Sequence, residues 1–381
     1  MQNLDDLSIF RDKQFSEAVD KLEKLMAQSL RAFIIGAGCS KCAGLPLTAE
    51  LISTVLKNDK VDKTSRDILE IIKNNFAGSE LSNIENYLSE LIDFLAIVER
   101  RTETNADNKA IHLGELICDK NTLVNTIEQI KQAIVNAVEK NISIETHWKF
   151  IKAIHRPIRP GKSGVNQCVD YLVLNYDTLI EDALALEKIT FTDGLVGGVT
   201  GWWEPKTFSD DRLFARVLKL HGSINWRLFP GESLPRRVSE TIKDANISNQ
   251  RIVIWPASTK YREIQFDPFA QLIKLAREIL RPQSGTQRVL VICGYSFGDQ
   301  HINLEIDRAL HESTDLTVLV FWSEETLNDV LKKWNDDFSI REQILIYGKR
   351  GFWHGDVVIP TTFDLPWWKF ENLIRLLGGE R

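Results

Sequence analysis

Six short apolar runs of strand length constrain the fold of this chain more than any other feature. They are "RAFII" (31–35), "DYLVL" (170–174), "RVLKL" (216–220), "RIVIW" (251–255), "RVLVICG" (288–294) and "LTVLVFW" (316–322). Helical segments such as "DPFAQLIKLAREIL" separate several of them. Continuous apolar strands that alternate with helices are typical of a parallel sheet that is buried on both faces. The sequence therefore predicts an α/β fold in which helices cover both faces of a parallel sheet.

A long stretch with helical periodicity lies between the first apolar run and the second. Residues 56–160 repeatedly place apolar side chains at helical spacing, as in "SNIENYLSELIDFLA" and "NTLVNTIEQIKQAIVNAVEK". We therefore expect one α/β domain, formed by 31–55 and 161–322, with a helical insertion over 56–160. An N-terminal helical segment (1–30) precedes this domain, and a mixed C-terminal segment (323–381) follows it.

Composition and charge exclude several classes of protein. Of the 381 residues 43% are hydrophobic and 26% are charged, which is typical of a globular protein with a large core. The formal net charge of −6 argues against a broad surface for direct nucleic-acid binding. No apolar run is long enough to cross a membrane, and the acidic N-terminus differs from a secretory signal. We therefore expect a cytoplasmic protein without a membrane partner.

The cysteines indicate neither disulfides nor a metal site. The chain has five of them, an odd number, and their spacings are irregular, which favours a reducing compartment. Cys39 and Cys42 form a C-x-x-C pair, but a structural zinc site usually needs a second close pair, which this sequence lacks. We therefore expect no bound metal.

A glycine-rich turn follows the first apolar run. "GAGCSKCAGLP" places Gly36 and Gly38 between a predicted strand and a helix that should begin near Thr48. Glycines in that position let the backbone approach a pyrophosphate at the N-terminus of a helix. The dinucleotide fingerprint G-x-G-x-x-G is incomplete, however, because Lys41 stands at its third glycine. A turn that only packs a helix on the sheet is the alternative.

Two further runs end in polar residues. Asn175 and Asp177 follow the run at 170–174, and His221 follows the run at 216–220. Ligands of open α/β sheets bind beyond the carboxyl ends of the strands, so these side chains are well placed for a site. Histidine titrates near neutral pH and can therefore exchange a proton there. The alternatives are that Asp177 caps the following helix and that His221 is structural.

A fourth polar motif follows the run at 288–294. In "GYSFGDQHIN" the glycines and Ser296 could surround a ribose or a phosphate, whereas Asp299 could be a helix N-cap and His301 a surface residue. Each motif is ambiguous alone. Together they place Gly, Asn, Ser, Asp or His after four strands that should end at the same edge of one sheet.

In this order, the motifs "GAGCSKCAGLP", "NYD", "KLHGSINW" and "GYSFGDQHIN" resemble those of the sirtuin-like NAD-consuming domains. The resemblance covers roughly 31–322 and is strongest to the sirtuin-like NADases of bacterial anti-phage defence, especially the partner of a HerA-type ATPase. It implies a Rossmann-like NAD-binding domain in which a helical insertion replaces the sirtuin zinc module. Features of protein deacylases are missing: "GLPLTAEL" replaces their Gly-Ile-Pro-Asp-Phe-Arg loop, Leu174 replaces a Gln, and four zinc cysteines are absent.

The resemblance also implies roles for the matching residues. Gly36, Ala37, Gly38 and Ser40 would hold the NAD diphosphate, and Gly294 and Ser296 would lie near the adenosine ribose. Asn175 would position the reactive ribose and its water, Asp177 would hold the nicotinamide carboxamide, and His221 would be the catalytic base.

We therefore expect an NAD hydrolase that releases nicotinamide and ADP-ribose and depletes cellular NAD in anti-phage defence. The alternatives are an NAD-dependent protein deacylase and a non-catalytic scaffold that senses NAD or ADP-ribose. The resemblance implies regulation by a HerA-type ATPase or helicase.

The tryptophans raise a separate question. Trp367 and Trp368 with Phe370 favour a homo-oligomer contact near the C-terminus, unless these rings belong to the core. Trp202, Trp203 and Trp226 could likewise line a pocket or fill the core. The sequence leaves both questions open.

Overall fold

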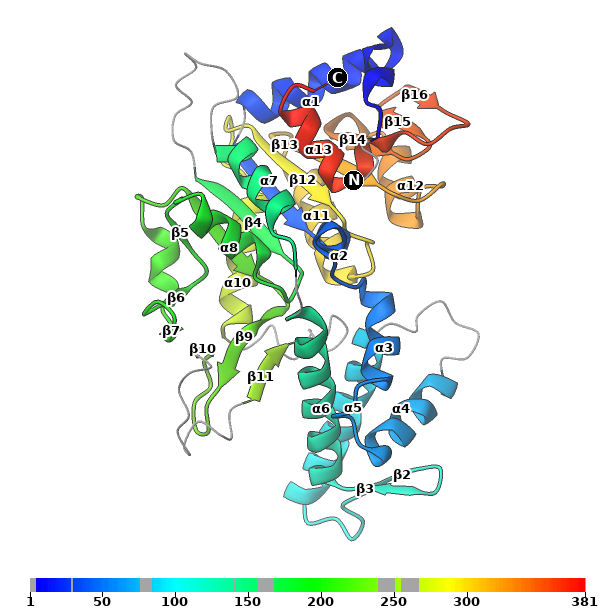
Figure 1. Cartoon of the computed structure of the whole chain (residues 1–381), viewed down its shortest axis with the longest axis vertical. Coiled ribbons are helices and arrows are strands. Elements are labelled where there is room, and N and C mark those ends of the chain that lie inside the picture. Colours follow the sequence, from blue (N-terminus) through cyan, green and yellow to red (C-terminus); the bar gives the residue numbers. More distant parts are fainter. Residues whose placement is uncertain are drawn as a thin grey trace.

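A large, mostly parallel sheet forms the centre of the molecule (Figure 1). The computed structural model describes residues 5–28, 30–75, 84–139, 142–155, 168–238, 251–254 and 267–380. Within these ranges nine strands pair in the order β16-β15-β14-β13-β12-β1-β4-β8-β5. Their bounds are β1 (Leu30–Ile35), β4 (Val169–Val173), β5 (Phe191–Thr192), β8 (Ala215–Lys219), β12 (Arg288–Cys293), β13 (Leu316–Trp322), β14 (Ile344–Gly348), β15 (Gly351–His354) and β16 (Val357–Pro360).

The strands from β14 to β5 are parallel, and β15 and β16 add an antiparallel edge. Alternate residues of β1 enter different cores: Phe33 and Ile35 face one cluster of buried side chains, and Ala32 and Ile34 face the other. One face is covered by α1 (Lys13–Gln28), α7 (Glu145–His155), α8 (Leu179–Leu186) and α13 (Phe370–Leu377). The other is covered by α10 (Phe269–Leu280), α11 (Gln300–Glu312) and α12 (Asp329–Asp336). The predicted α/β fold class is confirmed.

A helical lobe lies beyond the carboxyl edge of the sheet, at the bottom of Figure 1. It contains α3 (Thr48–Leu56), α4 (Lys63–Asn75), α5 (Ile84–Glu103), α6 (Lys120–Val138) and a hairpin of β2 (Ile111–Leu113) and β3 (Leu116–Cys118). The lobe has its own core, which also includes Tyr176, Leu179 and Ile224 from the α/β part. The sequence placed α7 in this insertion, but α7 packs on the sheet instead.

A second, antiparallel sheet has the strand order β11-β9-β10-β7-β6. Its strands are β6 (Leu195–Val196), β7 (Gly201–Trp203), β9 (Gly222–Leu228), β10 (Arg236–Arg237) and β11 (Arg251–Ile254). The prediction that 251–255 joins the parallel sheet is therefore wrong. An apolar run indicates burial but does not identify its partner, and β11 pairs with β9, which leaves the main sheet directly after His221.

The two ends of the chain pack together on the main sheet (Figure 1). Tyr347 Oη donates to the carbonyl oxygen of Ala18 at 2.9 Å, and the ring of Trp367 stacks on that of Phe10 with centroids 4.9 Å apart. Trp367 is fully buried and Phe370 is 5% exposed, so both rings belong to the core of this chain. The predicted segments 1–30 and 323–381 thus share one core with the sheet.

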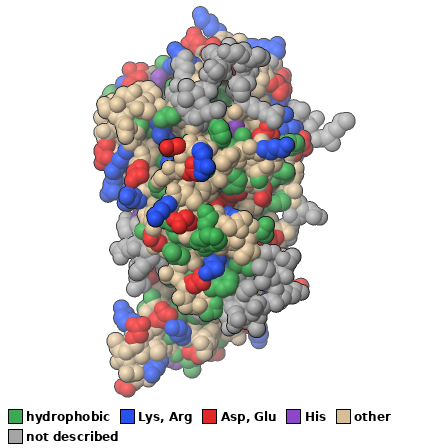
Figure 2. Space-filling view, turned by 90° about the vertical axis from the view of Figure 1, so that its left-hand side faces the viewer, with side chains coloured by type: hydrophobic (Ala, Val, Ile, Leu, Met, Phe, Trp, Pro, Cys, Tyr) green, Lys and Arg blue, Asp and Glu red, His purple; other side chains and the backbone are tan. Residues whose placement is uncertain are grey.

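Short helical turns complete the described elements. They are α2 (Ala37–Ser40) and the 3₁₀ turns Ser8–Arg11, Lys41–Ala43, Pro205–Ser209, Arg341–Gln343 and Pro366–Trp368. Figure 2 shows one face of the molecule, on which acidic and basic side chains are interspersed. Among the described residues, no helix is both long enough and apolar enough to span a membrane.

Candidate functional site

The four polar motifs converge at the carboxyl edge of the main sheet. They follow β1, β4, β8 and β12. These four parallel strands lie next to one another in the sheet, in the order β12-β1-β4-β8. The backbone ladder continues one residue beyond these strands: Leu174 N donates to Ile35 O at 3.0 Å, and Leu220 N donates to Val173 O at 3.0 Å. The register therefore brings the following loops together, as the sequence predicted.

The first and last of these loops touch each other through their glycines. Gly38 N donates to Gly294 O at 2.9 Å. A Cβ on Gly38 would lie 2.7 Å from Gly294 Cα, and one on Gly36 would overlap the Gly294 carbonyl. Gly294 itself has φ +62°, a conformation that favours glycine. These glycines therefore serve close packing between the loops, whatever else they bind.

Asn175, Ser40 and Asp177 form a buried hydrogen-bond network. Asn175 Nδ2 donates to Ser40 Oγ at 2.7 Å and to Gly36 O at 3.1 Å. Ser40 Oγ donates to Asp177 Oδ2 at 2.7 Å. Asp177 Oδ1 accepts the amide of Leu179, the first residue of α8, at 3.1 Å. Asp177 thus contacts Ser40 with one oxygen and the first residue of α8 with the other, although the N-cap position itself belongs to Thr178.

His221 lies between two carboxylates. Its side chain is 5% exposed, its Nε2 lies 3.2 Å from Asp299 Oδ2, and its Nδ1 lies 3.9 Å from Glu85 Oε1. Gly222 follows with φ +80°, which lets the chain turn from β8 into β9. The sequence predicted neither carboxylate contact. Glu85 comes from α5 in the helical lobe and has no sequence signal that distinguishes it.

Asn175 and His221 follow adjacent strands at the same level. β4 and β8 pair in parallel with Val173 opposite Lys219, and two more residues lead to Asn175 and His221. The amide of Ile224 also donates to Tyr176 O at 3.0 Å, so the loops stay paired beyond the strands. Asn175 and His221 therefore occupy neighbouring backbone positions just beyond the ends of two paired strands.

Comparisons with known proteins found a family model and a solved structure that are similar to this chain. A family model described as SIR2-like domain matches residues 170–340, which include Asn175, Asp177, His221 and Gly294. A solved structure is described as a Sir2-homologue triple mutant in complex with 2'-O-acetyl ADP ribose. Its sequence is 13% identical to this chain, and the match covers 82% of this chain and 87% of that chain with a TM-score of 0.36. No curated protein matches the chain.

A buried ion pair contacts the loop that contains Asp177. Lys219, the last residue of β8, is fully buried, donates to the carbonyl oxygen of Asp177 and lies 3.4 Å from Glu181 Oε1. Burial raises the pKa of Glu181 to about 7, against the opposing effect of Lys219. The motifs did not predict this pair, although the lysine within the apolar run "RVLKL" indicates a buried charge that needs a partner.

The other residues that the sequence singled out take no part in the buried hydrogen-bond network. Ala37 is partly exposed at the start of α2, and Ser296 is exposed, with its carbonyl oxygen 3.5 Å from Asn328 Nδ2. Trp226 and Trp203 are buried with ring centroids 5.9 Å apart, so they fill the core on one face of the main sheet. Trp202 is 52% exposed.

The cysteines of the C-x-x-C pair are buried or partly buried thiols. Cys42 Sγ donates to the carbonyl oxygen of Cys39 at 3.1 Å. Burial raises the pKa of Cys42 to about 12, which keeps the thiol protonated. In the described part of the chain, no group of three or more His, Cys, Asp and Glu side chains is placed to hold a metal ion.

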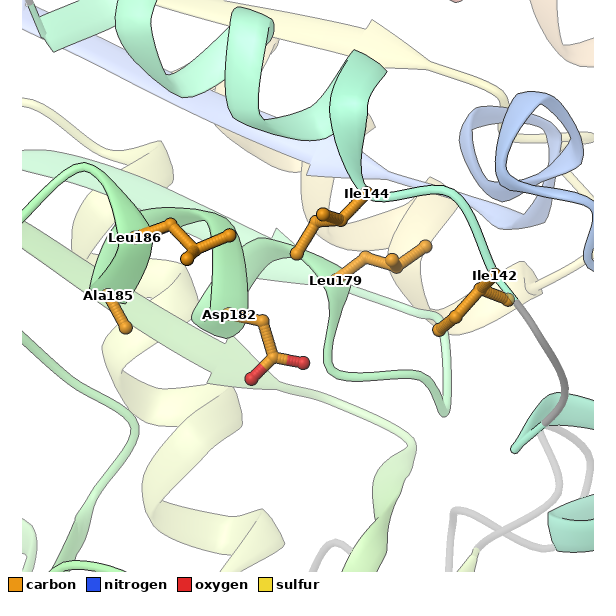
Figure 3. A pocket seen from close by; sticks show the side chains of 6 residues that line it. All are labelled: Ile142, Ile144, Leu179, Asp182, Ala185 and Leu186. Atoms are coloured by element: carbon orange, nitrogen blue, oxygen red, sulfur yellow. The ribbon is translucent and has the colours of Figure 1, made fainter.

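A cavity of about 500 Å³ lies beside α8, outside the network described above (Figure 3). Its lining is mostly aliphatic with one carboxylate: Ile142, Ile144, Leu179, Asp182, Ala185 and Leu186. None of the predicted site residues lines it. We therefore place the candidate site at the sheet edge and not in this cavity.

Proposed function

We propose that this protein is an NAD hydrolase that cleaves the bond between nicotinamide and ribose. The observation that carries the proposal is the position of Asn175 and His221 just beyond the ends of the paired strands β4 and β8, in a region similar to a SIR2-like domain, with Asn175 bonded to the buried Ser40. The products are nicotinamide and ADP-ribose. The family match supports chemistry on NAD, and the site residues support hydrolysis.

The reaction needs few catalytic groups. Breaking this glycosidic bond builds positive charge on the ribose, as in glycoside hydrolysis. The nicotinamide leaves as a neutral molecule, so it needs little help from an acid. Asn175 can orient the ribose and a water molecule, His221 can accept a proton from a ribose hydroxyl or that water, and such general-base help contributes about 10²–10⁴-fold.

Asn175 offers the substrate one acceptor without any change in the network. Its Nδ2 already donates to Ser40 Oγ and Gly36 O, whereas its Oδ1 can accept from a ribose hydroxyl or a water molecule. Asp177 Oδ2, which accepts from Ser40, is the acceptor that would hold the amide of the nicotinamide.

Two wider parts of the proposal depend on the motif resemblance alone. One is that the activity depletes cellular NAD in anti-phage defence. The other is that a HerA-type ATPase regulates it, with this chain as a homo-oligomer. Both stay predictions.

Chromatography of NAD after incubation with the purified protein tests the proposal. Wild type, alone or with the candidate ATPase, should form nicotinamide and ADP-ribose, and Asn175→Ala and His221→Ala should each lose about 10²-fold or more. His112→Ala, at an exposed position in the β2–β3 hairpin, is the matched control and should keep wild-type activity. Release of O-acetyl-ADP-ribose only when an acetylated peptide is added would identify a deacylase instead. Binding of NAD without turnover would identify a scaffold.

A further inference from the structure

Asp299 uses its two carboxylate oxygens for two different purposes. It is the N-cap of α11, where Oδ1 accepts the amides of His301 at 3.0 Å and Ile302 at 3.4 Å. The other oxygen, Oδ2, lies 3.2 Å from Nε2 of His221. The same carboxylate thus fixes the start of a helix and contacts the imidazole of the candidate site.

The position of this carboxylate is fixed from several directions. The hydroxyl of Tyr295 accepts the amide of Asp299 at 3.2 Å and lies 3.0 Å from its carbonyl oxygen. Asp299 is 5% exposed and His221 is 4% exposed, so bulk water does not compete strongly for their contact. A helix terminus and a buried tyrosine therefore hold the carboxylate against the imidazole.

An ionised carboxylate only accepts hydrogen bonds, so its partner nitrogen must carry the proton. In the neutral imidazole this leaves Nδ1 as the acceptor. Nδ1 is also the nitrogen on the side of the helical lobe, 3.9 Å from Glu85 Oε1. We infer that Asp299 is a positioning residue: through its contact with Nε2 it sets the tautomer of His221, so that Nδ1 is the nitrogen that accepts the proton in the reaction. The effect on catalysis rests on the proposed function, whereas the contact between Asp299 and His221 does not.

Asp299→Asn isolates this contact from the helix cap. Asn and Asp are equivalent N-caps, so Oδ1 can keep its two amides while the new NH₂ group faces His221. That group donates to Nε2 and therefore favours the opposite tautomer, with the proton on Nδ1. Asp119→Asn is the matched control, because Asp119 caps α6 by accepting the amide of Thr122 at 2.8 Å at an exposed position.

Activity gives the first readout. Asp299→Asn should lower kcat for NAD hydrolysis by about 10²–10⁴-fold with a smaller change in KM, and Asp119→Asn should not. In the His221→Ala background, Asp299→Asn should cause no further loss, because it acts through the imidazole. Wild-type activity in Asp299→Asn, or an equal loss with and without His221, overturns the inference.

Nitrogen-15 NMR of the histidine rings gives a second readout that does not need activity. In spectra recorded over a pH series, the neutral imidazole of wild type should carry the His221 proton on Nε2, and Asp299→Asn should move it to Nδ1. The His221→Ala spectrum assigns the signal. A wild-type proton on Nδ1, or the same tautomer in both proteins, refutes the role of Asp299. If wild type shows the expected tautomer but does not hydrolyse NAD, the proposed function fails and the positioning role stands.

Discussion

Glu85 of the helical lobe places its Oε1 atom 3.9 Å from Nδ1 of His221 at the edge of the main sheet. The same oxygen lies 3.5 Å from the hydroxyl of Tyr176, which follows Asn175 in the chain. Apolar contacts reinforce this junction, because Tyr176 and Ile224 share the core of the lobe. The insertion therefore forms one wall of the candidate site, and a change in how the lobe packs would change the surroundings of His221.

Ser40→Ala should impair both stability and the candidate site. Ser40 Oγ links Asn175 Nδ2 to Asp177 Oδ2, and its loss leaves both buried groups without that partner. We expect a loss of about 1–3 kcal/mol in the free energy of unfolding, measured with urea, and at least about tenfold slower NAD hydrolysis. Ser53→Ala is the control, because Ser53 is exposed and bonds only within its own helix, to Glu50 O at 2.8 Å. Unchanged stability and activity in Ser40→Ala would show that this hydroxyl does not order the network.

Gly38→Ala should separate the first and last loops of the site. The new Cβ would meet backbone, at 2.7 Å from Gly294 Cα, so one of the loops must move. Such overpacking costs about 1–3 kcal/mol of stability, which urea unfolding measures. Gly298→Ala provides the comparison, because its Cβ would meet only Ser296 Oγ, at 3.4 Å, and should change stability by less than about 0.5 kcal/mol. Equal stability of the two variants would contradict the close packing.

Asp170→Asn should destabilise the fold without affecting the site. Asp170 is buried in β4 at the opposite edge of the sheet, where it accepts from Arg216 Nε at 2.6 Å and Arg288 Nη1 at 2.7 Å. Removing the charge takes away the carboxylate that both partly buried guanidinium groups contact, which costs about 3 kcal/mol or more. Asp210→Asn, which breaks the exposed pair with Arg212, should leave the unfolding midpoint unchanged. The folded Asp170→Asn protein should hydrolyse NAD like wild type, and a large loss of activity would argue against a purely structural pair.

The sequence was most informative where burial alone decides the structure. Each apolar run in the described residues became a strand, because a continuous run can be buried on both faces of a sheet. The same pattern could not show which strands pair, and so β11 was assigned to the wrong sheet. Convergence of the motifs at one edge followed from the parallel order. The roles of the site residues toward NAD stay predictions.

The contact partners of individual side chains were harder to predict from the sequence. Glu85 looks like any polar residue of an amphipathic helix, and its contact with His221 arises only when the lobe packs on the sheet. Lys219 was a stronger signal, because a lysine that is buried in a strand must find an anion. The C-terminal rings were ambiguous because Trp367 could equally have been an interface residue, until its stacking on Phe10 placed it in the core.

The buried pair of Glu181 and Lys219 gives a prediction about pH. Burial raises the pKa of Glu181 from 4.5 to about 7, so between these values the folded protein keeps a proton that the unfolded chain has lost. The free energy of unfolding that this group contributes therefore falls as pH rises from about 4.5 to about 7, by up to about 3 kcal/mol. Burial lowers the pKa of His147 and His155 to about 4, which has the opposite effect over a similar range.

Comparison of wild type with Glu181→Gln separates these effects, because the histidines act in both proteins while the glutamine cannot titrate. Urea unfolding at a series of pH values should give a stability difference, wild type minus variant, that decreases as pH rises through this window. The decrease should stop above about pH 7, where Glu181 is ionised in both the folded and the unfolded state. A difference that is flat, or that grows with pH, would mean that Lys219 already compensates the buried carboxylate fully, and that Glu181 is ionised beneath the Asn175–Asp177 loop throughout the neutral range.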